Sequence, residues 1–289
     1  MSIEVWGMMG AGAAALVAGM ILVRPRFLAA TGADKVLVLG PALEAVPLAI
    51  FAAEHFTDAH GLMQIVPKWL PGPLFWTYLV GAALLAAALS FMAFRCVRWS
   101  AALLALLFLI IVATVDLPGL PANLHDRIFW TLTVRETCFA GGAMVLAGSV
   151  WPSGSAAGRM LMAIGRGIVA TVMVFYGIEH FVFPHNVVGV PLEKLTPAWM
   201  PAPLLTAYFV GIVLVIAGAA LLFRRTVRIA AAACGAVLLL LTASFYGAIL
   251  VAQIHTDLAV EGINYFGDTL LFATTVLLAG SGAAERKKP

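Results

Sequence analysis

The sequence predicts an all-α integral membrane protein with about nine transmembrane helices: two parallel four-helix repeats and one extra N-terminal helix. The 289 residues are 63% hydrophobic and only 11% charged, whereas a typical soluble domain has about 25% charged residues. Several apolar runs reach the ~20 residues that a helix needs to cross the hydrocarbon core. They are too long and too rich in alanine and leucine to be strands of a membrane barrel. The lipid bilayer is therefore the expected partner, and nucleic acid is not.

Hydropathy along the chain predicts the individual spans, with boundaries uncertain by about two to four residues. The predicted spans cover residues 8–23, 36–56, 74–94, 100–117, 128–150, 160–183, 204–223, 229–253 and 263–281. Because nine is an odd number, the two ends of the chain are expected on opposite sides of the membrane.

The basic residues predict the orientation. The flank before the first span contains Glu4 and no basic residue, which favours a retained span with its N-terminus outside over a cleaved signal peptide. The positive-inside rule assigns the larger basic group to the cytoplasm. This group is Arg24, Arg26, Lys35, Arg95, Arg98, Arg159, Arg166, Arg224, Arg225, Arg228, Arg286, Lys287 and Lys288, against Lys68, Arg127 and Lys194 on the other side. The expected location is a bacterial-type inner membrane, with the C-terminus in the cytoplasm.

Much of the chain repeats itself. Residues from about 40 to 150 recur from about 170 to 282, with Glu54 matching Glu179 and Trp69 matching Trp199. Each copy holds four spans, an even number, so both should insert in the same orientation around an axis along the membrane normal. The predicted units are an N-terminal helix in 1–35, a first repeat in 36–150 and a second repeat in 158–283. The loop after the first span of the repeat is five residues longer in the second copy.

Three short motifs mark both copies. A helix ends in Glu-His-Phe, a Trp-x-Pro-x-Pro segment leads into the next helix, and Tyr-x-x-Gly follows early in that helix. In the first copy these are Glu54-His55-Phe56, Trp69-Leu70-Pro71-Gly72-Pro73 and Tyr78-Leu79-Val80-Gly81. The chain thus resembles a tandem duplication of the DoxX-like family of small bacterial membrane proteins. The resemblance implies a four-helix unit and a place beside a quinone-linked redox pathway or complex. The family often has a glutamate after Tyr-x-x-Gly, and residues 82–85 and 212–215 are apolar here.

Polar side chains are predicted to form a layer at the outer face. All six histidines fall into repeat-related pairs, accompanied by two glutamates. The layer is Glu54, His55, His60, His125, Glu179, His180, His185 and His255. Imidazole and carboxylate suit a transition metal, which gives a possible metal site at His55, His60, His125, His180, His185 and His255. His55 and His60 are five residues apart and share a helix face poorly. Capping of the helix ends is therefore an alternative, and haem is disfavoured because no histidine lies deeper in the same spans.

Four charged residues are predicted near the middle of the membrane: Glu44, Arg135, Glu136 and Asp268. Glu44 lies ten residues before Glu54, which places it about 15 Å below the outer layer at 1.5 Å per residue. Intramembrane charges are costly and usually face a partner inside the bundle. We expect Arg135 to pair with Glu44, and Arg135 and Glu136 to pair with other spans rather than with each other. The cluster suits a proton path or a quinone head group, or else a structural ion pair.

Trp69 and Trp199 are predicted to belong to an interfacial lid that folds over the outer layer, because the neighbouring prolines keep these segments non-helical. The leading functional hypothesis is a membrane protein associated with a quinone-linked redox pathway. The alternatives are a small-solute or proton-coupled transporter and a non-catalytic structural or assembly subunit. The sequence specifies no catalytic residue, and the candidate cofactors are a quinone and a metal ion.

Overall fold

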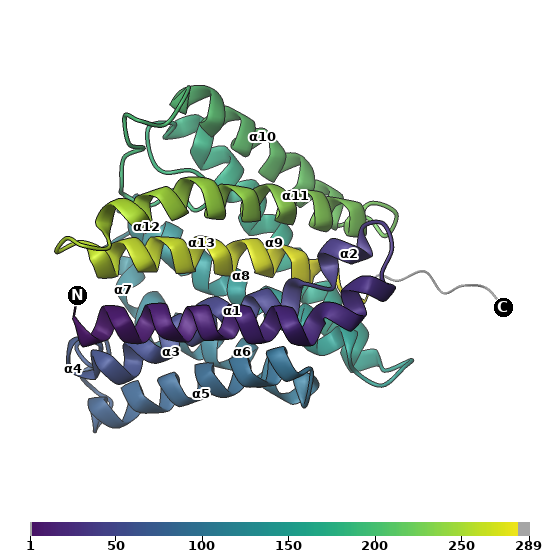
Figure 1. Ribbon diagram of the computed structural model, residues 1–289, viewed down its shortest axis with the longest axis horizontal. Helices are drawn as coiled ribbons and strands as arrows, with labels where there is room; N and C mark the ends of the chain where they lie inside the picture. Colours follow the sequence, from purple (N-terminus) through teal and green to yellow (C-terminus); the bar gives the residue numbers. More distant parts are fainter. Residues whose placement is uncertain (1, 283–289) are drawn as a thin grey trace.

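The computed structural model describes residues 2–282, and over that range it contains helices and loops but no β-strand (Figure 1). This confirms the all-α prediction. The α-helices are α1 (Ile3–Ala29), α2 (Asp34–Leu37), α3 (Gly40–Thr57), α4 (Ala59–Leu62), α5 (Pro73–Ala93), α6 (Val97–Ile111), α7 (Leu117–Gly119), α8 (Arg127–Ser149), α9 (Ala156–Val182), α10 (Pro203–Leu221), α11 (Val227–Leu241), α12 (Gly247–Gln253) and α13 (Ala259–Ala279). Two π-helices, η1 (Val112–Asp116) and η3 (Thr242–Tyr246), and a 3₁₀ turn, η2 (Leu120–Ala122), complete the set. The basic residues Arg286, Lys287 and Lys288 lie outside the described range.

Eight segments within residues 2–282 are long and apolar enough to cross a membrane. They are α1, α2 with α3, α5, α6 to η2, α9, α10, α11 to α12, and α13. Helix α8 has 23 residues and runs beside them, but it carries Arg135 and Glu136 in its middle and is less apolar. The nine predicted spans thus correspond to these eight segments and α8, and a multi-pass membrane protein is supported.

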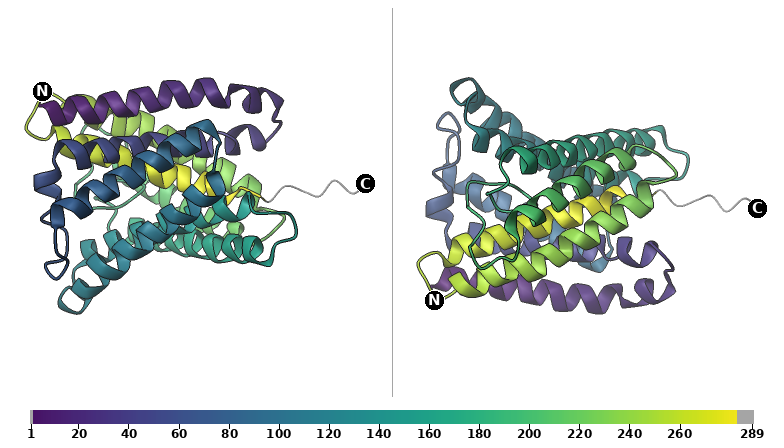
Figure 2. Two further views of the ribbon diagram at one scale, coloured as in Figure 1. Left: turned by 90° about the horizontal axis from the view of Figure 1, so that it is seen from below. Right: turned by 90° about the horizontal axis from the view of Figure 1, so that it is seen from above.

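The helices lie roughly side by side, with α8 and α13 at the centre (Figures 1 and 2). In the first half of the chain α3 packs on α5, α5 on α6 and α6 on α8; in the second half α9 packs on α10, α10 on α11 and α11 on α13. The halves join where α8 packs on α9 and α13 packs on α3. Each contact has a counterpart in the other half, as two like-oriented units would give. The boundaries of those units stay a prediction. Helix α1 packs outside this set, against α3.

Close backbone contact joins α8 to α9. A Cβ atom on Gly165 would lie 2.4 Å from the carbonyl oxygen of Gly141, and one on Gly148 would lie 2.5 Å from that of Gly158. Small residues allow such an approach in a membrane, where helix association depends on packing rather than on the hydrophobic effect. These four glycines therefore set the distance between the two halves of the bundle.

Replacing Gly165 with alanine should lower the free energy of unfolding by about 1–3 kcal/mol, because the methyl group would overlap the α8 backbone. Gly167 lies on the same helix, and among the described residues no atom comes within 4 Å of the place that its Cβ would occupy. Gly167→Ala should therefore raise the free energy of unfolding by about 0.5–1 kcal/mol through helix propensity alone. Thermal unfolding in detergent measures both, and equal effects of the two substitutions would contradict the close contact.

Candidate functional site

The two Glu-His-Phe motifs end α3 and α9 with the same local geometry. The Nδ1 atom of His55 lies 2.8 Å from the carbonyl oxygen of Phe51, and Nδ1 of His180 lies 2.6 Å from that of Tyr176. Each histidine thus contacts the backbone one helical turn earlier. The following phenylalanines also match, since Phe56 stacks on Tyr78 with 6.1 Å between ring centroids and Phe181 stacks on Tyr208 with 6.0 Å. The motif therefore has a structural role in both halves: its histidine contacts the last turn of the helix, and its phenylalanine packs on the next helix.

In the second half, cationic and hydroxyl groups surround the motif. Glu179 is buried, lies 3.4 Å from a guanidinium nitrogen of Arg127 and accepts hydrogen bonds of 3.0 and 3.1 Å from the Thr131 hydroxyl. The backbone N–H of Gly189 donates to Nε2 of His180 over 2.9 Å. Because Nε2 accepts, the hydrogen-bond network assigns the proton to Nδ1. Glu179 and His180 thus have their hydrogen bonds made within the protein.

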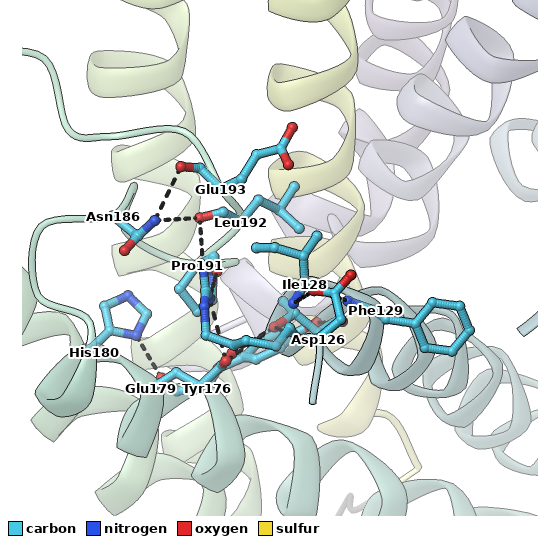
Figure 3. Close-up of polar contacts among 12 residues, drawn as sticks. Asp126, Ile128, Phe129, Tyr176, Glu179, His180, Asn186, Pro191, Leu192 and Glu193 are labelled. Carbon is cyan, nitrogen blue, oxygen red and sulfur yellow. Dashed lines mark hydrogen bonds and ion pairs between the residues drawn. The ribbon is translucent and has the colours of Figure 1, made fainter. Parts of the chain in front are cut away.

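A small hairpin, residues 186–195, covers this motif. Asn186 and Leu195 form an antiparallel bridge, and Val187, Val188 and Val190 between them are fully or almost fully buried. Figure 3 shows how Asn186 and residues 191–193 gather above Glu179 and Tyr176. Gly189 at the tip adopts φ 101°, in the region that favours glycine.

Two side chains from the bundle hold the hairpin through its backbone. The Tyr246 hydroxyl donates to the carbonyl oxygen of Val188 over 2.6 Å, and Arg127 donates to those of Pro191 and Leu192 over 2.5 and 3.3 Å. The hairpin takes up much of the longer loop that the sequence shows in the second copy. The apolar run Val187–Val190 in that loop was the available signal, and sequence reasoning missed it.

The tryptophans predicted as a lid lie at the surface, and the lid stays a prediction. Trp69 is 66% exposed and Trp199 is 53% exposed, and Trp199 packs on Phe245 with 5.6 Å between ring centroids. Over the second motif, the hairpin backbone makes the hydrogen bonds with His180 and Tyr246. Both tryptophans remain suited to the interface between lipid and water.

Replacing Tyr246 with phenylalanine should destabilise the hairpin, because the buried carbonyl of Val188 would lose its donor at a cost of about 1–3 kcal/mol. Tyr208→Phe is the matched control, since the Tyr208 ring is 40% exposed and stacks on Phe181. Hydrogen exchange of residues 186–195 should accelerate in Tyr246→Phe and stay unchanged in Tyr208→Phe. Unchanged exchange in both would show that the hairpin does not depend on this bond.

In the first half, the motif has a different environment. Glu54 is buried and accepts a hydrogen bond of 2.8 Å from the Asn264 amide on α13. Within residues 2–282 no cationic side chain pairs with it. His55 is only partly buried, and the loop that follows is too short to form a hairpin like that of the second half. The two glutamates thus share a motif but differ in their partners: Glu179 has a cationic partner, and Glu54 has a neutral one.

Three of the four charged residues predicted at mid-membrane form a cluster on α8 and α13. Arg135 lies 2.8 Å from Glu136 and 2.5 Å from Asp268, measured between the guanidinium nitrogens and the carboxylate oxygens. Glu136 and Asp268 are repeat-equivalent, and the single arginine bridges them. The expected pair of Arg135 with Glu44 is therefore wrong, and so is the expectation that Arg135 and Glu136 do not pair. The long Arg135 side chain reaches the carboxylates of Glu136 and Asp268. Glu44 lies on α3 and accepts a hydrogen bond from Thr274 instead.

Glu44 is fully buried and has almost no polar surroundings. One of its carboxyl oxygens accepts a hydrogen bond from the Thr274 hydroxyl on α13. Its other oxygen, Oε1, is buried and has no partner among the described residues. A buried carboxyl group in this state is costly when ionised.

Asp116 is a further member of the site that the sequence analysis missed. It ends the π-helix η1, which packs against α8, and it lies within electrostatic reach of Glu136 and Arg135. Its Oδ2 atom is buried without a partner among residues 2–282. The second π-helix, η3, ends at Tyr246, at the matching place of the other half. π-Helical turns are frequent at functional sites and leave little trace in a hydropathy profile.

Together these groups occupy successive depths of the bundle, and we name them the carboxyl track: Glu54, Asn264, Asp268, Arg135, Glu136, Asp116, Thr274 and Glu44. On α13, Asp268 follows Asn264 by four residues, about 6 Å, and Thr274 follows Asp268 by six, about 9 Å. The buried apolar side chains Leu271 and Phe272 lie between Asp268 and Thr274. In the predicted orientation, the track therefore has an outer part with Glu54, Asp268 and Glu136, and an inner part at Glu44, with an apolar step between them.

The predicted histidine layer is only partly brought together. His55 and His180 lie in the bundle, while His60, His125, His185 and His255 are exposed near the loops. Across residues 2–282, no three His, Cys, Asp or Glu side chains are close enough to hold a metal ion. The metal prediction thus gains no support from the geometry.

A groove of about 400 Å³ lies beside Glu179, where α8 begins and α9 ends. Its walls are Trp130, Phe175, Ile178, Val182 and Phe183, and Arg127 and Glu179 contribute to its lining. Aromatic and aliphatic walls with two charged groups suit a flat amphipathic ring.

Comparison with known proteins gives one match. Residues 44–118 match a family described as a domain of unknown function, DUF8561. The match covers about a quarter of the chain, from Glu44 on α3 to α7, and includes Glu54 and Asp116. It does not assign the chain to the DoxX-like family. No curated protein and no solved structure matches the chain.

Proposed function

We propose that this protein carries protons through the membrane along the carboxyl track, as part of a proton-coupled transporter of a small solute. The observation that carries the proposal is the excess of carboxyl groups. Within the described range, Glu44, Glu54, Asp116, Glu136 and Asp268 accompany a single cation on the track, Arg135. A purely structural ion-pair network would match its charges, because an unpaired buried charge is destabilising. Carboxyl groups that outnumber their cations can be accommodated by binding protons.

The track also has the division that coupled transport needs. The outer part ends at Glu54 near the surface, the inner part is the isolated Glu44, and buried apolar side chains separate them. A continuous polar line would leak protons. An interrupted one requires the helices to move before a proton passes, which is how alternating access operates in repeat-built transporters.

Reconstituted vesicles test this proposal. Under a pH gradient and with a candidate solute present, vesicles with the wild-type protein should take up protons faster than empty vesicles, measured with an enclosed pH-sensitive dye. Asp268→Asn should reduce uptake to the level of empty vesicles, because it removes the carboxylate that connects α13 to Arg135. Glu193→Gln is the control, since Glu193 is exposed in the loop. Equal rates in wild-type and empty vesicles across candidate solutes would refute proton coupling.

A second candidate function is the handling of a quinone beside a membrane redox complex, as the resemblance to the DoxX-like family implies. The groove next to Glu179 favours it, because aromatic walls and a charged end suit a quinone ring. Val182→Trp should fill the groove and abolish binding of a short-chain quinone. Val251→Trp places the same side chain at an exposed position on α12 and should not. Absence of quinone binding to the wild-type protein would remove this candidate.

The orientation belongs to the proposal as well. Asp34, Arg98 and Arg228 gather at the end of the bundle opposite Glu54, and the positive-inside rule favours the cytoplasm for that end. The N-terminal flank would then lie outside a bacterial-type inner membrane.

A further inference from the structure

The end of the bundle away from Glu54 contains a cavity that neither proposed function uses. Its volume is about 730 Å³, and it is bounded by the end of α1, by α2, by the α5–α6 turn, by the start of α11 and by the last turns of α8 and α13. Three arginines, Arg26, Arg98 and Arg228, line it together with one carboxylate, Asp34. We call it the basic cavity.

Two of the arginines are held by aromatic rings rather than by carboxylates. The guanidinium carbon of Arg26 lies 3.5 Å from the centre of the Phe94 ring, and that of Arg98 lies 4.7 Å from the Trp99 ring and 5.4 Å from the Trp151 ring. Within residues 2–282, Arg228 pairs with Asp34, and neither Arg26 nor Arg98 forms an ion pair. Stacking on a ring orients a guanidinium group and leaves its edge of N–H donors available.

The turn between α5 and α6 is strained where it borders the basic cavity. Phe94 has φ 52° and Cys96 has φ 57°, both in the left-handed region that non-glycine residues seldom adopt. The corresponding turn between α10 and α11, residues 222–226, contains no residue with positive φ. Strain of this kind often accompanies a binding site. Here it presents the Phe94 ring to Arg26 and directs Cys96 to the cavity.

The remaining walls are apolar. Leu37, Val38, Pro41, Leu146 and Val150 line the side that faces the bundle. The cavity therefore combines free guanidinium donors with hydrocarbon surface, at the depth where Trp99 and Trp151 mark the interface between lipid and water. Arginine pairs bind the oxygens of a phosphate group well. A soluble phosphate ester would use the donors but not the apolar wall.

We propose that the basic cavity binds the headgroup of an anionic phospholipid from the cytoplasmic leaflet. The phosphate contacts Arg26 and Arg98, and the first part of the acyl chains lies on the apolar wall. Basic pockets between transmembrane helices on this side are suited to anionic lipid. The basic cavity contains no residue of the carboxyl track, so this proposal does not depend on proton coupling.

Cys96 supplies a reporter for this site. It is exposed and lines the cavity, whereas Cys138 and Cys234 are buried. The protein is placed in nanodiscs of phosphatidylcholine with or without phosphatidylglycerol, and alkylation of Cys96 by a water-soluble maleimide is timed. Native mass spectrometry of the same samples counts retained lipid. Phosphatidylglycerol should slow alkylation and should be retained as a bound lipid.

Arg26→Gln combined with Arg98→Gln should abolish this protection and weaken retention by about 20- to 30-fold, or roughly five-fold for each arginine. Arg24→Gln combined with Arg225→Gln removes two exposed arginines that do not line the cavity and should change neither readout. Arg26→Lys combined with Arg98→Lys should give intermediate protection, which also checks that the fold tolerates substitution there. Equal protection in the two glutamine pairs would overturn the proposal. If soluble glycerophosphate protected Cys96 equally well in pure phosphatidylcholine nanodiscs, the lipid proposal would be overturned. The ligand would then be a soluble phosphate ester.

Discussion

Arg135→Gln is expected to lower the free energy of unfolding by about 3 kcal/mol, the largest loss of stability among single substitutions of the charged residues. Among the described residues, the substitution removes the only cation that pairs with Glu136 and Asp268, and it leaves two carboxylates together in a low-dielectric bundle. Breaking a buried ion pair on one side costs about 3–5 kcal/mol. We expect the lower end, because the three side chains keep 15–16% of their surface exposed. Thermal and denaturant unfolding in detergent measure the effect.

The triple variant Arg135→Gln, Glu136→Gln, Asp268→Asn separates structure from function. With all three charges removed, no unpaired charge is left, so most of the stability lost in Arg135→Gln should return. Proton uptake should not return, because the carboxyl groups at the centre of the track are gone. A triple variant as unstable as Arg135→Gln would mean that the cluster's shape and hydrogen bonds, rather than its charge balance, hold α8 against α13. Arg95→Gln is the control, since Arg95 is exposed in the α5–α6 turn.

The parts of this fold that depend on periodicity and composition were predictable from the sequence. Apolar runs of sufficient length are enough to find α1 or α10, because a spanning segment must satisfy its backbone within itself. Helix α8 could be placed despite Arg135 and Glu136, because its flanks remain apolar and its counterpart α13 supports the assignment. Intramembrane charges are rare enough that Glu44 and Asp268 were recognisable as members of a polar site.

The sequence could not predict which charged residue meets which. From its position in the sequence, Arg135 could equally reach α3 or α13, and the choice depends on helix rotation about the α8–α13 contact. Asp116 was missed because the extra residue of a π-turn changes the direction of its side chain without changing hydropathy. The hairpin was missed because buried loops are uncommon, and its burial depends on donors from Arg127 and Tyr246, which are distant in the sequence.

The repeat-equivalent glutamates allow the sharpest functional comparison, because Glu54 and Glu179 occupy the same motif in the two halves. Glu54 contacts the neutral amide of Asn264, one helical turn from Asp268. Glu179 lies against Arg127 and Thr131 beneath the hairpin. Of the two, only Glu54 lacks a cationic partner among the described residues and adjoins the carboxyl track. Glu54→Gln should reduce proton uptake about 10-fold or more, since it removes the carboxyl group at one end of the proposed proton path.

Glu179→Gln should keep most of the uptake and instead lower the free energy of unfolding by about 1–2 kcal/mol, because Arg127 loses a charged hydrogen-bond partner. The loss is limited, since Arg127 still donates to Pro191 and Leu192 and its side chain is 21% exposed. Vesicle uptake and thermal unfolding measured on both variants distinguish the roles. Equal loss of uptake in the two variants would mean that both Glu-His-Phe motifs take part in transport. The proposed difference in role between Glu54 and Glu179 would then be wrong. Unchanged uptake in Glu54→Gln would show that Glu54 is not part of the proton path. Protons would then have to reach Asp268 without the α3 carboxyl group.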